Sequence, residues 1–67
     1  MHRYRVTFAI NADGTPVSRL ASGLAYIVNA DSPAGAKIAA YGRLYRAFPV
    51  MKQPPGLQDV FEIGPAA

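Results

Sequence analysis

The sequence contains no cysteine and no tryptophan, and His2 is its one histidine. Without cysteine, neither a disulfide bond nor a thiolate metal site can form. His2 has no second histidine with which to share a metal ion, so we expect no metal and no cofactor. No stretch approaches the roughly 18 consecutive apolar residues of a membrane span, and the basic start is not followed by the apolar run of a signal peptide. We therefore expect no membrane partner and a cytoplasmic location.

Acidic residues are also scarce, with four against seven lysines and arginines, for a net charge of +3. Asp13 belongs to a predicted turn and Asp31 to a predicted helix start, so each has a local role. Asp59 and Glu62 fall on opposite faces of one predicted strand, which makes them a poor acid–base pair. The serines have no neighbouring general base. We predict a protein that is not an enzyme and has no catalytic residues.

What the sequence does have is enough apolar material for one small core. The chain has 67 residues, of which 51% are hydrophobic. This length has room for a single domain over residues 1–67. A core of this size contributes only about 3–5 kcal/mol. Close packing or self-association must add to it, so a homodimer is one expectation.

Two segments alternate in hydrophobicity as strands do. In residues 3–10, every second side chain is aromatic or branched and is expected to face the core: Tyr4, Val6, Phe8 and Ile10. Residues 24–30 place a second such set on one face: Leu24, Tyr26, Val28 and Ala30.

Asp13-Gly14 predicts a turn between these strands, because glycine accepts positive φ without steric cost. The following residues 16–23 allow two interpretations. Thr15 could cap a short helix that begins at Pro16, or the segment could be part of a long strand with a bulge near Gly23. We favour a connection with one helical turn.

Asp31-Ser32-Pro33 is typical of a helix start, and Pro49 ends the helix predicted over residues 33–47. At 3.6 residues per turn, the larger apolar side chains share a stripe that we expect to face the sheet: Ala34, Ile38, Tyr41, Tyr45 and Phe48. The opposite face holds small residues and two arginines: Gly35, Ala36, Ala39, Arg43 and Arg46. Its small side chains would let another element approach closely, or they simply form a solvated helix surface.

Residues 57–63 predict a last strand with Leu57, Phe61 and Ile63 facing the core. The order strand, strand, helix, strand predicts an α+β fold. In it, a three-stranded, mainly antiparallel sheet of order 2-1-3 carries one helix on one face. The alternative is an order in which the third strand pairs beside the second. The uncovered sheet face would hold Arg3, Arg5, Thr7, Ala9, Ala25, Ile27, Asn29, Gln58, Val60 and Glu62. All four tyrosines are expected to face inward, which leaves no aromatic ring beside the two arginines for base stacking.

A basic domain without a catalytic motif is best interpreted as a protein-interaction module. Its candidate partner-binding residues are Arg3, Arg5, Arg19, Ile27, Arg43, Arg46 and Lys52. Small domains of this kind are common in phages and mobile elements. Some of them, including anti-CRISPR proteins, inhibit a host defence complex by stoichiometric binding, and size and class make this role our first expectation. A small nucleic-acid-binding protein and a structural subunit of a larger, virion-type assembly are the alternatives.

Overall fold

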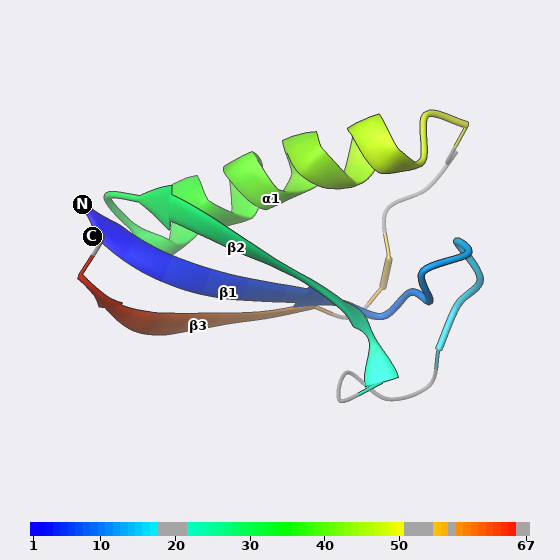
Figure 1. Cartoon of the computed structure of the whole chain (residues 1–67), viewed down its shortest axis with the longest axis horizontal. Helices are drawn as coiled ribbons and strands as arrows, with labels where there is room; N and C mark the ends of the chain where they lie inside the picture. Colours follow the sequence, from blue (N-terminus) through cyan, green and yellow to red (C-terminus); the bar gives the residue numbers. More distant parts are fainter. Residues whose placement is uncertain (18–21, 51–54, 57, 66–67) are drawn as a thin grey trace.

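The computed structural model of the protein describes residues 1–17, 22–50, 55–56 and 58–65. These residues form β1 (His2–Phe8), β2 (Leu24–Ala30), α1 (Pro33–Ala47) and β3 (Gln58–Pro65). The helix lies across one face of the sheet, and the other face is open (Figure 1). The predicted order of elements is confirmed.

The sheet has the order β2-β1-β3, and the central strand β1 is antiparallel to both neighbours. The predicted α+β fold with sheet order 2-1-3 is therefore confirmed. β1 ends at Phe8, two residues earlier than expected, and Ile10 forms an isolated bridge with Pro16 instead. That bridge holds Pro16 in an extended position, so a helix beginning at Pro16 is wrong. Residues 18–21 of the same segment lie outside the described part of the chain.

The turn at Asp13-Gly14 is confirmed and is held by side-chain hydrogen bonds. The Asp13 carboxylate accepts from the Thr15 hydroxyl at 2.6 Å and from the Thr15 backbone N–H at 3.0 Å. Gly14 has a φ of 92°, a left-handed conformation that glycine adopts without strain. Thr15 thus stabilises this turn through its hydrogen bonds to Asp13 and does not cap a helix.

The core lies between β1 and α1. Tyr4, Val6 and Phe8 are all buried on the helix side of the sheet, as their alternation predicted. They meet the helix residues Ala36, Ala40 and Leu44, which are fully buried, and β2 adds Val28 and Ala30 to the same cluster. The helix begins as expected, with the Ser32 hydroxyl accepting from the Gly35 N–H at 3.1 Å and Pro33 in the first turn.

The helix face predicted to meet the sheet is wrong. Ile38 is 74% exposed and Tyr45 is 40% exposed, whereas Ala36 and Ala40 are completely buried. Tyr41 and Phe48 do pack partly against the core. The physical reason is space: the sheet already supplies large rings from Tyr4 and Phe8, and alanines on the helix leave room for them. The small residues predicted on an outer face therefore lie against the sheet.

The face assigned to the last strand is also wrong. Tyr4 pairs with Glu62 and Val6 with Val60, so Gln58, Val60 and Glu62 lie on the helix side. Phe61 pairs with Arg5 and shares its open face, and Ala9, expected on that face, is buried. Apolar residues lie on both faces of β3, so its sequence pattern alone does not show which face meets the helix. Pairing with β1 decides it. Leu57 lies outside the described residues.

The orientation of α1 can be tested by two substitutions with opposite expectations. Ala40→Leu should destabilise the protein by about 1–3 kcal/mol, because three extra carbons must enter a filled core. Ile38→Ala should change the free energy of unfolding by less than about 0.5 kcal/mol, because the side chain is exposed. Urea denaturation followed by circular dichroism measures both. A loss of about 2–5 kcal/mol in Ile38→Ala, typical of a buried isoleucine, would show that the helix is turned the other way.

Candidate functional site

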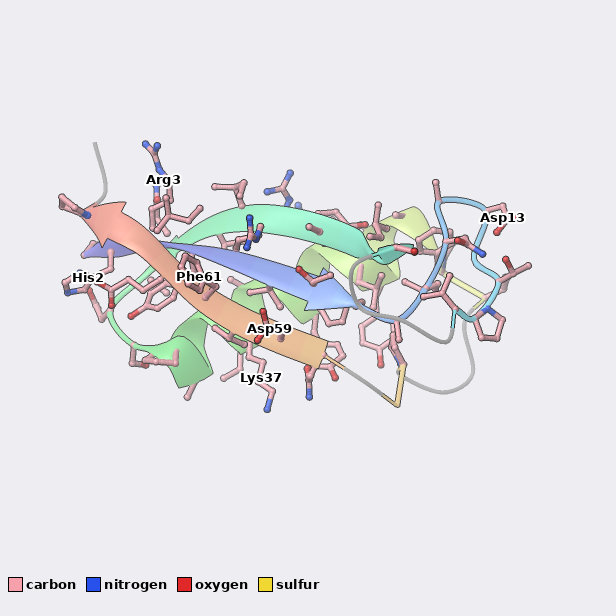
Figure 2. The ribbon with its side chains drawn as sticks, turned by 90° about the horizontal axis from the view of Figure 1, so that it is seen from below. His2, Arg3, Asp13, Lys37, Asp59 and Phe61 are labelled. Atoms are coloured by element: carbon pink, nitrogen blue, oxygen red, sulfur yellow. The ribbon has the colours of Figure 1, made fainter. Side chains whose placement is uncertain are left out.

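The open face of the sheet is the candidate site. It is formed by every second residue of the three strands, and Figure 2 views the molecule from this side. The pairing register places eight side chains on it: Arg3, Arg5, Thr7, Ala25, Ile27, Asn29, Asp59 and Phe61. Of the residues predicted for this face, Gln58, Val60 and Glu62 belong to the opposite side.

Arg5 occupies the centre of the open face, with an apolar neighbour on either side. It pairs with Ile27 on β2 and with Phe61 on β3. Its Cζ carbon lies 5.3 Å from the centroid of the Phe61 ring, which is a cation–π contact. Phe61 is 54% exposed and Ile27 is 47% exposed, so both present apolar surface to the solvent. Arginine and aromatic residues are both enriched at binding interfaces.

The structure divides the seven residues predicted to bind a partner. It brings Arg3, Arg5 and Ile27 together on the open face. Arg43 and Arg46 lie on α1, on the other side of the sheet layer, so they do not join that group. Arg19 and Lys52 fall outside the described residues.

Arg43 has a structural contact of its own at the outer edge of β2. Its Nη1 atom donates a hydrogen bond to the Ile27 carbonyl oxygen at 2.8 Å, and its Cζ carbon lies 5.2 Å from the centroid of the Tyr26 ring. The side chain thus occupies a backbone acceptor that an added strand would need. Arg43 therefore fastens the helix to the sheet edge.

Phe61 is the residue of this face that the sequence pattern did not predict. An aromatic residue in a strand predicts burial in the core, but half-exposed aromatic rings on open sheets give the same pattern. The sequence does hold one indication of this exposure. Residues 60 and 61 are both apolar, and only one of two adjacent strand residues can face the helix. The open face therefore does carry an aromatic ring beside the arginines.

A second group of polar residues lies where β1 begins. His2 is the first residue of β1, and its Nδ1 atom lies 3.3 Å from a carboxylate oxygen of Glu62. Tyr4, the next residue on that face, is buried beside them. Burial raises the pKa of the Tyr4 hydroxyl above its ordinary value, and the negative charge of Glu62 raises it further. This group ties the two strand ends together.

Within residues 1–17, 22–50, 55–56 and 58–65, no three His, Asp or Glu side chains lie close enough to hold a metal ion together. In the same ranges, no helix has the length and apolar character needed to cross a membrane.

No protein-family model, no curated protein and no solved structure matches the chain.

The raised pKa of Tyr4 predicts a loss of stability in alkali. Above pH 10.0, the ordinary value, Tyr4 ionises in the unfolded chain while the folded protein keeps its proton. Its stabilising contribution is therefore complete below that pH and is lost as the pH rises through the folded-state pKa. Urea denaturation between pH 8 and 11 should show a steeper decline for the wild type than for Tyr4→Phe. Identical declines would contradict this role for Tyr4.

Proposed function

We propose that this protein is a non-enzymatic binding module that docks on another protein through the open face of its sheet. The observation that carries the proposal is the Arg5–Phe61 contact beside Ile27. Exposed apolar side chains that share one face can be buried by a partner, and each contributes binding energy through the hydrophobic effect. Arginine and aromatic residues are also those most often found at binding hot spots.

The charges on the face indicate the kind of partner surface. Arg3 and Arg5 are both positive, and Asp59 is the single acid among the eight residues of the face. The whole chain has a net charge of +3. The partner that fits is therefore a protein surface with an apolar centre and an acidic rim, since complementary charge speeds association and selects the partner.

Docking of this kind is what the expected role as a stoichiometric inhibitor requires. A rigid domain that covers a site on a larger complex excludes other ligands from it without chemistry of its own. Inhibition of a host defence complex, expected from size and class, is thus one outcome of the proposed binding. Incorporation into a larger assembly would use the same face.

Binding of single-stranded nucleic acid is a second candidate, and Phe61 favours it. A base can stack on an exposed ring beside arginines, which is how many single-strand-binding proteins work. Two features favour a protein partner instead. The face has one ring among its eight side chains, and Asp59 would repel phosphate groups.

The proposal can be tested with two matched double variants. Arg5→Gln with Phe61→Thr removes the charge and the ring from the open face but keeps residues suited to strands. Arg46→Gln with Val50→Thr makes a comparable change at exposed positions away from that face. Immobilised wild type and control should retain the same protein at 1:1 stoichiometry from a lysate of the source cell, and the open-face variant should lose it. Equal retention by all three would exclude the open face as the docking surface.

Fluorescence anisotropy with labelled single-stranded DNA and RNA distinguishes the second candidate. Phosphate contacts make nucleic-acid affinity fall steeply as salt increases. We expect no binding that depends on Phe61 at physiological salt. Tight, salt-sensitive binding that Phe61→Thr abolishes would instead establish the nucleic-acid interpretation.

A further inference from the structure

On the helix side of the sheet, opposite the proposed docking face, α1 lies off centre. Gly35 and Arg43 lie toward β2: a Cβ atom at Gly35 would lie 3.6 Å from that of Ala30, and Arg43 bonds to the Ile27 carbonyl. α1 contacts β2 more extensively than it contacts β3. The helix side of β3 is therefore only partly covered, and Val60 on this strand remains half-buried.

The uncovered strip forms an apolar groove of about 560 Å³ between α1 and β3. Its lining residues are Pro33, Ala34, Lys37, Ile38, Tyr41 and Val60. Lys37 is the one charged residue among them, and its side chain projects past the outer edge of β3 (Figure 2). No partner carboxylate for Lys37 is found among the described residues, where the one such contact of a carboxylate joins Glu62 to His2.

The helix residues on this side have the spacing of a helix–helix seam. Ala34, Ile38, Tyr41 and Tyr45 follow one another at intervals of four, three and four residues. This spacing keeps apolar side chains on one stripe, where a neighbouring helix can bury them. Tyr41 and Tyr45 stack with their ring centroids 6.0 Å apart, so the stripe continues beyond the groove.

The dimensions of the sheet also suit a second helix. Packed helices lie about 8–10 Å apart, and neighbouring strands lie about 4.8 Å apart. A helix placed beside α1 at that distance would lie above β3 and its outer edge. An extended strand added to β3 would lie farther from α1 and would leave Ile38 uncovered.

Charge decides between a second copy of this chain and a different partner. α1 carries Lys37, Arg43 and Arg46 and contains no acidic residue. Two copies of α1 packed along this groove would bring their two Lys37 charges into one apolar contact with no negative charge from either helix, which is unfavourable. An acidic helix gains attraction at the same place.

We propose that the groove between α1 and β3 binds an acidic amphipathic helix of a partner protein. The apolar residues of that helix pack on Ile38, Tyr41 and Val60, and an acidic residue pairs with Lys37. This is the helix-in-groove mode of recognition. The site is separate from the open face, so either surface can fail its test without affecting the other.

Three synthetic peptides test the proposal. The first is a helical peptide with leucines at intervals of four and three residues and glutamates on its flanks. The second replaces the glutamates by lysines, and the third interrupts the acidic sequence with prolines, so that it cannot form a helix. Titration of labelled protein, followed by amide chemical shifts, should show binding of the acidic helix alone, with changes concentrated at residues 33–41 and Val60.

Variants of the protein identify the contacts. Lys37→Glu should lower the affinity for the acidic peptide by about tenfold and raise the affinity for the lysine peptide, because it replaces an attraction by a repulsion. Ile38→Ala should lower the affinity for the acidic peptide by about tenfold while leaving the stability of the fold unchanged. Arg46→Glu, the same charge change elsewhere on α1, should alter the affinity by less than about threefold.

Several results would contradict the proposal that this groove binds an acidic helix. Equal binding of the acidic and lysine peptides, absence of binding, or binding of the proline peptide with equal affinity would each do so. Shift changes centred on Phe61 would place the peptide on the open face instead. Sedimentation velocity that shows a dimer abolished by Ile38→Ala would mean that a second copy occupies the groove.

Discussion

Two aromatic rings of the central strand set the spacing between the layers of this protein. Tyr4 and Phe8 project from β1 into the space below α1, and the helix accommodates them by presenting Ala36 and Ala40. Small side chains opposite large ones allow close packing without voids. A chain of 67 residues has few other sources of stability, so this fit between the rings and the alanines carries the fold.

The same fit determines which surfaces remain for binding. Because alanines face the sheet, the larger apolar residues of α1 point sideways and outward, and Ile38 becomes the most exposed of them. Because β3 pairs with β1 in a register that places Val60 on the helix side, its neighbour Phe61 emerges on the open face. Each proposed surface is thus a consequence of how the core is filled.

The two surfaces lie on opposite sides of one thin sheet and differ in chemistry. The open face combines Arg5 with Phe61 and Ile27, and the groove combines Lys37 with Ile38 and Tyr41. Both are apolar with a positive charge, which fits partners that offer acidic groups around an apolar contact. Arg43, one of the residues predicted to bind a partner, fastens the helix to β2 by its hydrogen bond to the Ile27 carbonyl.

The sequence by itself determined the order of elements, the turn at Asp13-Gly14 and the inward face of β1, because each depends on local conformation or on a strictly alternating pattern. It also predicted the sheet order, because crossover connections have a preferred hand. It also placed Arg3, Arg5 and Ile27 on the open face. Only the tertiary structure decided the rotation of α1 and the face of β3. Both elements carry apolar residues on two sides, so periodicity left two orientations open. The volume of Tyr4 and Phe8 and the pairing of β3 with β1 selected one of them.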